Sequence, residues 1–142
     1  MKAFIIFAVY AVISVNGGVV DHQVCGGRGV FIQMRISDCE GAIARMTPGV
    51  SYSCQGDIIP SAAADALRLK ISAFFNGAII PIIDAVVPNS SVEAGLQYTL
   101  AWTIVPSTFL SGSTVPVTAE VVNEESQELE VCTGIMTEIA GV

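Results

Sequence analysis

The chain has 142 residues, of which 52% are hydrophobic and only 13% charged, and its formal net charge at pH 7 is −7. This length predicts one domain with enough residues to bury a sizeable core. An acidic chain without a basic patch argues against nucleic acid as a partner and against electrostatic docking to anionic lipid surfaces.

The first segment of the chain is typical of a secretory signal peptide. Lys2 supplies a short charged region, residues 3–15 form an apolar run, and Val15 and Gly17 suit the positions three and one before a cleavage site. The run is too short to span a bilayer comfortably, although an N-terminal membrane anchor is the alternative. We expect residues 1–17 to be removed, leaving residues 18–142 as one exported domain, and loss of Lys2 changes the net charge from −7 to −8.

Alternation of apolar and polar residues predicts four strands in the first half of this domain. Residues 29–36 form the first, and its expected inward face is Val30, Ile32, Met34 and Ile36. Residues 37–48 are irregular, and a second strand follows at 49–58. The third strand covers residues 65–75, and its expected inward face includes Leu69, Ile71 and Phe75. Asn76-Gly77 then predicts a tight hairpin turn into a strand at 78–83, because both residues tolerate a positive φ.

The central strand, residues 95–105, has the clearest pattern in the chain. It begins at Gly95, ends before Pro106, and its expected inward face is Leu96, Tyr98, Leu100, Trp102 and Ile104. Two more strands are predicted at 114–122, with Val117 inward, and at 129–139. Seven strands with turn signals between them predict an all-β fold, a two-sheet immunoglobulin-like β-sandwich.

The interior of this sandwich has two possible forms. The sheets can pack closed, or they can splay at one edge and leave an apolar cavity that favours an apolar ligand. By composition alone, a filled core explains the sequence better, even with a mean hydropathy of +0.65.

The four cysteines, Cys25, Cys39, Cys54 and Cys132, all follow the predicted signal peptide. An even number in an exported chain predicts two disulfides, for which three connectivities exist. No pair has CxxC spacing, and His22 is the single histidine. A zinc site would lack its usual ligands, so we expect no metal and no cofactor.

The residue patterns of the common hydrolases do not occur in the chain. There is no GxSxG sequence around a serine, and His22, close to the N-terminus of the mature domain, is the one possible imidazole base. The acidic residues around the last turn, Glu124, Glu125, Glu128 and Glu130, indicate a solvated hairpin or, alternatively, a docking patch for a basic partner. We therefore expect a protein that is not an enzyme.

Several short motifs, taken in order, resemble the ML lipid-recognition family, which includes the Niemann–Pick type C2 sterol carriers and the group 2 mite allergens. They are Cys25 before the first strand, Gly49-Val50-Ser51-Tyr52 after Cys39, Asn76-Gly77 before the apolar run Ala78-Ile79-Ile80-Pro81, Gly95-Leu96-Gln97-Tyr98, and Cys132 in the last strand. The resemblance covers about residues 20–139. It implies a β-sandwich with an apolar cavity between the sheets that binds a sterol, fatty acid or other apolar lipid for transport or recognition. It also implies a protein that is secreted or delivered to the lumen of the endolysosomal pathway.

The resemblance implies a disulfide between Cys25 and Cys132, the first and last cysteines. This chain departs from the usual six cysteines of the family, because Ala44 stands near the expected partner of Cys39 and residues 87–93 contain no cysteine. We infer that Cys39 pairs with Cys54 instead. The missing loop bridge leaves the rim of the pocket less constrained.

The expected lipid-binding residues come from two sources. Inward positions of the predicted strands supply Ile32, Met34, Leu69, Ile71, Phe75, Tyr98, Leu100, Trp102, Val117 and Ile135. Positions that match the mouth of sterol-binding relatives supply Ile80, Ile82, Phe109 and Leu110. A slip of one residue in register would move every inward side chain of a strand to the other face.

Three further expectations complete the sequence-based account. Asn89 begins the sequon Asn89-Ser90-Ser91 and is expected to carry a glycan in a eukaryotic secretory pathway. We expect a monomer that contacts a membrane or a membrane receptor transiently to transfer its ligand. The rival hypothesis is an immunoglobulin-like adhesion or interaction module with a closed core. Trp102 fits this hypothesis poorly, because the tryptophan of an immunoglobulin domain follows soon after the first bridging cysteine, and Trp102 is far from Cys54 in the sequence.

Overall fold

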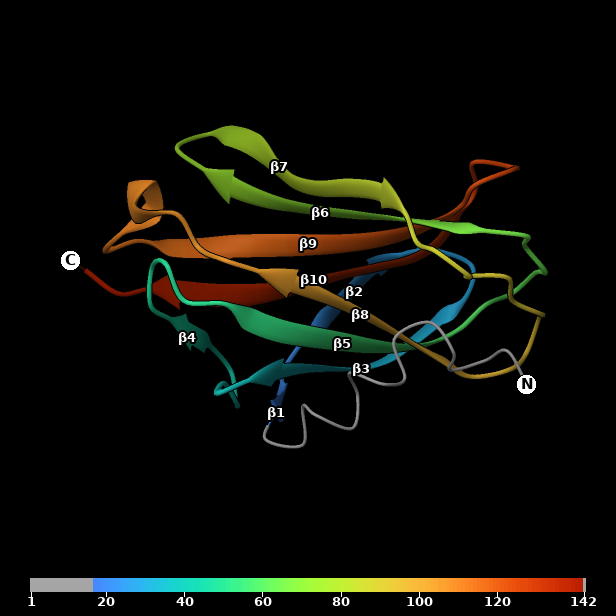
Figure 1. The fold of residues 1–142 in the computed structure, drawn as a ribbon, viewed down its shortest axis with the longest axis horizontal. Coiled ribbons are helices and arrows are strands. Elements are labelled where there is room, and N and C mark those ends of the chain that lie inside the picture. Colours follow the sequence, from blue (N-terminus) through green and yellow to red (C-terminus); the bar gives the residue numbers. More distant parts are fainter. Residues whose placement is uncertain (1–16, 142) are drawn as a thin grey trace.

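The computed structural model describes residues 17–141 and shows two packed β-sheets (Figure 1). Within this range there are ten strands and one 3-10 turn: β1 (Gly17–Val20), β2 (Gln23–Gly26), β3 (Val30–Ser37), β4 (Ala44–Met46), β5 (Tyr52–Ile59), β6 (Leu67–Phe75), β7 (Ala78–Val86), β8 (Tyr98–Ile104), η2 (Thr108–Leu110), β9 (Thr114–Asn123) and β10 (Leu129–Ile139). The predicted all-β, two-sheet sandwich is confirmed. The predicted signal peptide, except Gly17, lies outside the described residues.

The two sheets differ in size. The smaller sheet has the order β1-β3-β5-β8, and the larger has the order β2-β10-β9-β6-β7, with β4 pairing to β10. All these pairs are antiparallel except β4 with β10, which is parallel. Strands β7 and β8 therefore lie at one edge of the sandwich, and β1 and β2 lie at the other.

Burial confirms the period-2 patterns of β6 and of the first eight residues of β9, whereas β7 shows no such alternation. Leu67, Leu69, Ile71 and Ala73 of β6 are all buried, and the residues between them are only half-buried. The strand β10 spans the same residues as predicted, Leu129–Ile139. Asn76 (φ 52°) and Gly77 (φ 78°) form the predicted hairpin turn, because a two-residue turn of this kind needs positive φ at both positions.

The sequence-based strand list is incomplete. It omits β1, β2 and β4, which have only three or four residues each. Its inward face for the first strand is also wrong at two positions, because Val30 is 53% exposed and Ile32 points outward as well. The register between β3 and β5 shifts between Phe31 and Gln33. A β-bulge moves the following side chains to the other face, so Phe31 is buried and Ile32 is 37% exposed.

One end of the sandwich is closed by loops, and we call the part of the core beneath residues 60–66, 87–97 and 123–128 the closed end. Ala64 and Val92 pair with each other there, and Val87 and Val92 are buried. The Ser90 hydroxyl donates to the Val87 carbonyl oxygen (2.6 Å) and accepts from the Leu67 amide (2.8 Å). These bonds hold the loop over the ends of the sheets.

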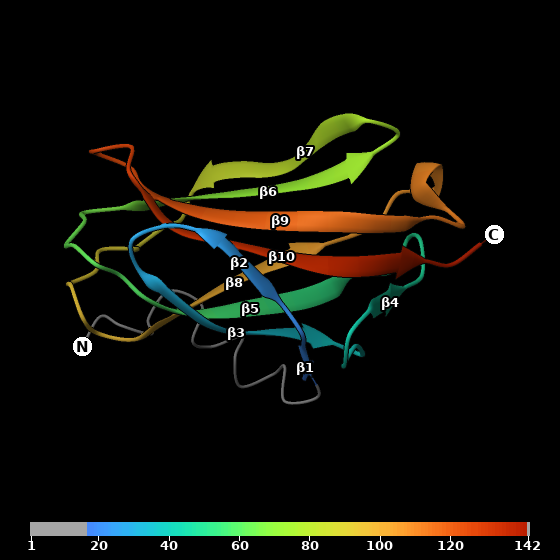
Figure 2. The same cartoon turned by 180° about the vertical axis from the view of Figure 1, so that it is seen from behind.

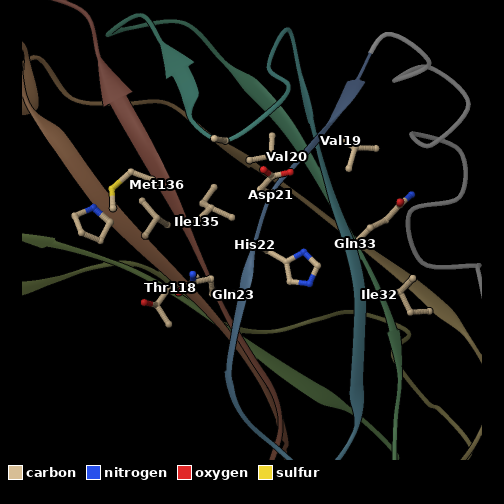
Figure 3. Close-up of a pocket in the computed structure, with 14 residues that line it drawn as sticks. Val19, Val20, Asp21, His22, Gln23, Ile32, Gln33, Thr118, Ile135 and Met136 are labelled. Atoms are coloured by element: carbon tan, nitrogen blue, oxygen red, sulfur yellow. The ribbon is translucent and has the colours of Figure 1, made fainter.

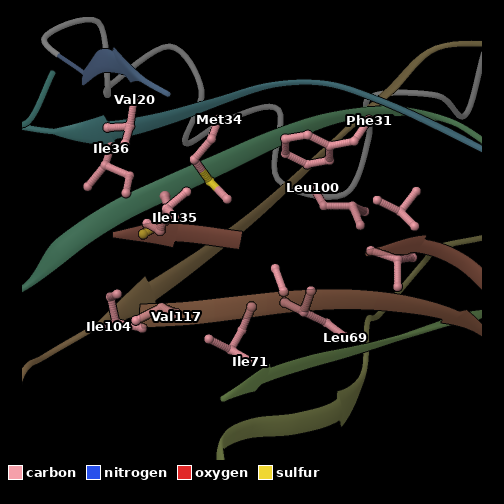
Figure 4. Packing of buried hydrophobic residues seen from close by; sticks show 14 of the residues in the cluster. Val20, Phe31, Met34, Ile36, Leu69, Ile71, Leu100, Ile104, Val117 and Ile135 are labelled. Atoms are coloured by element: carbon pink, nitrogen blue, oxygen red, sulfur yellow. The ribbon is translucent and has the colours of Figure 1, made fainter. Parts of the chain in front are cut away.

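The opposite end, which we call the open end, carries the β6–β7 hairpin, η2 and β4. Pairing of β6 with β9 stops at Ala73 and Val117, and the next residue of β9 is Pro116. Proline has no N–H to donate to a neighbouring strand, so the last residues of β6 extend past β9 without a ladder. Figure 4 shows Leu69, Leu100 and Phe31 gathered toward the closed end, with Ile104 and Val117 toward the open one.

The four cysteines form one disulfide. Cys25 of β2 is bonded to Cys132 of β10, as predicted. The predicted bond between Cys39 and Cys54 is wrong, because both are free and buried thiols. Their sulfur atoms have different surroundings: Cys39 Sγ lies 3.5 Å from the Arg45 carbonyl oxygen in the turn after β3, whereas Cys54 Sγ lies 3.8 Å from the Tyr52 carbonyl oxygen in the core.

Candidate functional site

A pocket of about 470 Å³ opens between the sheets at the open end, and we call it the mouth pocket. Its walls come from β7, β8, the segment that contains η2, and the C-terminal half of β10. The lining residues are Met46, Ala73, Ile80, Pro81, Ile82, Ile104, Val105, Pro106, Ser107, Phe109, Leu110, Val115, Val117, Thr137 and Ile139. No charged residue of the described chain is among them.

The two hydroxyl side chains of the mouth pocket already have partners. Thr137 Oγ1 donates to the Val115 carbonyl oxygen (2.7 Å), and Ser107 Oγ accepts from the Phe109 amide (3.1 Å). Because the lining holds only two hydroxyl groups and no charged side chain, a polar atom of a ligand would find few partners here, and burying it unpaired would cost free energy. A hydrocarbon incurs no such cost, since each buried methylene contributes roughly 0.8 kcal/mol.

Deeper between the sheets lies a small apolar void of about 10 Å³, the inner void. It shares Ile104 and Val117 with the mouth pocket and is otherwise lined by Met34, Ile36, Cys54, Ile71, Trp102, Ala119 and Ile135. A void of this size and lining stays dry. The mouth pocket and the inner void are thus neighbouring apolar hollows between the sheets, and we call the two together the apolar path.

The rim of the mouth pocket exposes large apolar side chains. Ile79 is 71% exposed, Phe109 is 69% exposed and Val105 is 54% exposed. Phe75 and Phe109 stack edge-to-face across the rim, with ring centroids 5.3 Å apart. This contact joins the β6–β7 hairpin to η2, so the two sides of the mouth meet through aromatic rings.

A second and more polar hollow of about 860 Å³, the rear groove, lies at the edge of β1 and β2 (Figure 3). Its lining includes Asp21, His22, Gln23 and Gln33 together with apolar residues of β9 and β10. The His22 ring packs edge-to-face on Phe31, with centroids 4.8 Å apart. Ile32, the residue that the bulge turns outward, belongs to this groove.

The structure distributes the predicted lipid-binding residues over four places. Nine line the mouth pocket or the inner void: Met34, Ile71, Ile80, Ile82, Trp102, Phe109, Leu110, Val117 and Ile135. Leu69, Tyr98 and Leu100 are buried in the core and line neither, while Phe75 stands on the rim and Ile32 in the rear groove. The predicted set omits most of the β10 wall, including Thr137 and Ile139, because alternation alone does not show which buried residues face a cavity.

The buried carboxylates outside these pockets are held by structural partners. Asp57 accepts hydrogen bonds from the Arg35 guanidinium and from Thr99 Oγ1 (2.8 Å), and Arg35 Nε also donates to Gln55 (3.1 Å). Glu130 accepts from the Ser61 amide (2.8 Å) and hydroxyl (2.9 Å). Neither carboxylate lines the mouth pocket or the inner void, so neither is placed to act on a bound molecule there.

The thiols have shifted ionisation. Burial, with a smaller contribution from the nearby Cys39 thiol, raises the pKa of Cys54 to about 12. Burial, with a smaller contribution from Asp38, also raises the pKa of Cys39. Both groups are therefore uncharged at neutral pH, and Cys54 contributes an apolar surface to the inner void.

Two further observations concern other kinds of site. Among residues 17–141, no group of three or more His, Cys, Asp or Glu side chains is arranged to hold a metal ion. In the same range, no helix has the length and apolar character that a membrane span requires.

Comparison with solved structures shows which known fold this structure resembles. The structure is similar to that of a Niemann–Pick type C2 protein from Japanese carpenter ant, with a TM-score of 0.71 and 14% sequence identity, and the match covers 84% of this chain and 98% of that one. The chain has a Niemann–Pick type C2-like fold. No family model matches the sequence, and no curated protein matches it either.

Two other solved structures match this chain with lower TM-scores. The C-terminal domain of wzt matches with a TM-score of 0.60 and 11% identity, over 86% of this chain and 78% of that one. Chicken MD-1 complexed with lipid IVa matches with a TM-score of 0.52 and 11% identity, over 82% of this chain and 87% of that one. At these identities the likeness concerns the fold, and what the chain binds is argued from its own residues.

Proposed function

We propose that this protein is an exported, non-enzymatic carrier that binds a sterol, a fatty acid or another apolar lipid between its two sheets, for transport or recognition. The observation that carries the proposal is the mouth pocket, an apolar hollow of about 470 Å³ without a charged lining residue, which lies beside the inner void. The fold likeness to a Niemann–Pick type C2 protein, and to MD-1 complexed with lipid IVa, supports it.

The rim of the mouth supports transient contact with a membrane during ligand transfer. Exposed side chains such as Ile79 and Phe109 can enter the apolar layer of a bilayer, as aromatic and aliphatic side chains do at membrane surfaces. The net charge of −7 disfavours anionic lipid surfaces, so contact with neutral lipid headgroups is the expected mode.

The test is organic-solvent extraction of the purified protein, followed by mass spectrometry of the extract. We expect a co-purified lipid at close to one molecule per chain, and saturable binding of a fluorescent sterol or fatty acid by the stripped protein. An empty extract together with no binding of either probe would support the rival closed-core interaction module.

A further inference from the structure

The larger sheet has a gap along the edge at which β2 and β4 pair with β10. Strand β2 pairs with β10 at Cys132–Gly134, and β4 pairs with it at Thr137–Ile139. Between them, Ile135 and Met136 have no neighbouring strand on that side within the described part of the chain. At the gap, Ile135 faces the core and is buried, and Met136 faces outward and is 39% exposed, as successive residues of a strand do.

The rear groove lies over this gap. The chain passes from the smaller sheet to the larger one through Asp21 and His22, between β1 and β2 (Figure 2). Asp21 donates its amide to the Gly41 carbonyl oxygen (2.9 Å), and Gly41 donates to the Val19 carbonyl oxygen (3.0 Å). These backbone bonds fix the crossing segment, so that one wall of the groove is rigid.

The groove and the apolar path meet at two side chains. Ile135 lines both the rear groove and the inner void, and Val117 lines these two and the mouth pocket as well. Only this pair of aliphatic side chains is shared between the rear groove and the inner void. A hydrocarbon chain that displaces them would connect the two edges of the sandwich.

The polar groups of the rear groove are available, in contrast to those of the mouth pocket. Within the described chain, the side chains of His22, Gln23, Gln33 and Thr118 make no hydrogen bond, and Figure 3 shows the four around the same hollow. Among residues 17–141, no lysine or arginine lines the groove, and Asp21 contributes a carboxylate. The groove therefore suits a hydrogen-bonding group that carries no negative charge.

We propose that the rear groove is a second binding site, which takes the uncharged, hydrogen-bonding head of an amphipathic ligand such as a long-chain alcohol or amide, while its hydrocarbon chain enters the interior beside Ile135. This inference rests on the proposed function, since it places one end of a lipid that occupies the interior. It assigns the head to the edge opposite the mouth, where free amide and imidazole groups replace the water that the head loses.

The location of the head is tested with hexadecanol that carries a photoreactive diazirine beside its hydroxyl group. After irradiation of the intact domain and digestion, we expect the label on rear-groove residues such as His22, Gln33 or Met136. A label on rim residues such as Ile79 or Phe109 would overturn the second site and leave the proposed function standing.

A matched pair of variants tests the same site by affinity. Gln33→Leu removes a hydrogen-bonding group of the groove, and Gln97→Leu makes the same change at an exposed position outside it. We expect Gln33→Leu to weaken hexadecanol binding by about three- to tenfold and to leave hexadecane binding unchanged, with Gln97→Leu altering neither. Equal hexadecanol affinity in all three proteins overturns the site, and failure of the wild type to bind even hexadecane removes the proposed function as well.

Discussion

The closed and open ends of the sandwich are built from the same strands with the same alternation, yet one is filled and the other is hollow. At the closed end, Leu67 and Tyr98 are at most 1% exposed beneath loops that hydrogen bonds hold in place. At the open end, the β6–β9 ladder stops at Pro116 and the mouth pocket begins. Alternation decides which side chains face inward, and what covers the ends of the strands decides whether the space between them closes.

The largest expected effect concerns the reactivity of Cys54, which lies on the inner void between the two ends. A pKa of about 12 in place of 9.0 lowers the thiolate fraction at pH 8 by about a thousandfold. We expect a thiol reagent to modify Cys54 at pH 8 only after denaturant is added. Because the unfolded chain deprotonates first, this group should also reduce stability as the pH rises from about 9 to 12. If the unreduced protein shows no titratable thiol even after it is unfolded, Cys39 and Cys54 are bonded to each other after all.

The next largest expected effect is on the free energy of unfolding, and it comes from the disulfide. This bond joins β2 to the half of β10 that lies toward the closed end. It joins residues 107 apart, for which the chain-entropy model gives about 4.7 kcal/mol. We expect the double variant Cys25→Ser, Cys132→Ser to lose about 2–5 kcal/mol of unfolding free energy in urea. Lipid affinity below the melting transition should remain close to that of the wild type, and a large loss of affinity would show that this pair of strands shapes the cavity.

Truncation of one aliphatic side chain at each end sharpens the comparison further. Leu100 is 1% exposed in the filled core, whereas Ile82 is 42% exposed on the rim. We expect Leu100→Ala to cost about 2–5 kcal/mol in urea unfolding and Ile82→Ala less than about 1 kcal/mol. Similar costs at the two positions would mean that the rim is packed as tightly as the core.

A small stability effect is also expected at the rim aromatic pair. Phe109→Ala removes the edge-to-face contact with Phe75, a type of contact that contributes about 0.5–1.5 kcal/mol. We expect a small fall in melting temperature, together with weaker binding to vesicles of neutral phospholipid measured by flotation. Unchanged flotation would remove Phe109 from the proposed membrane contact.

Sequence alone predicted most of the fold because burial in the long strands follows period 2. The bounds of β10 and the hairpin at Asn76-Gly77 were predicted correctly for that reason. The short strands β1 and β2 were missed because their segments, GGVV and QVCG, carry too few alternating residues. The bulge beside Phe31, which moves Ile32 outward, leaves no mark in the alternation.

The candidate site was predicted less completely than the fold. Periodicity identified Leu100 and Val117 equally well as inward residues, but only Val117 lines a cavity. The difference arises from Pro116 and from the loops over the closed end, which act through pairs of residues distant in the sequence. The prediction of a Cys39–Cys54 bond failed for a related reason, since the number of cysteines says nothing about where their sulfur atoms point.

The most direct measurement compares one substitution at two positions of β9. Val117 and Val121 lie on the same face of this strand and are 9% and 4% exposed, but Val117 lines the cavity and Val121 packs in the closed end. Lipid affinity and unfolding free energy are measured for Val117→Phe and Val121→Phe. We predict that Val117→Phe abolishes lipid binding with less than about 1 kcal/mol of destabilisation, whereas Val121→Phe costs about 1–3 kcal/mol by overpacking and leaves binding intact. Equal destabilisation at both positions, without loss of binding at Val117, would contradict the cavity and the lipid-binding function that rests on it.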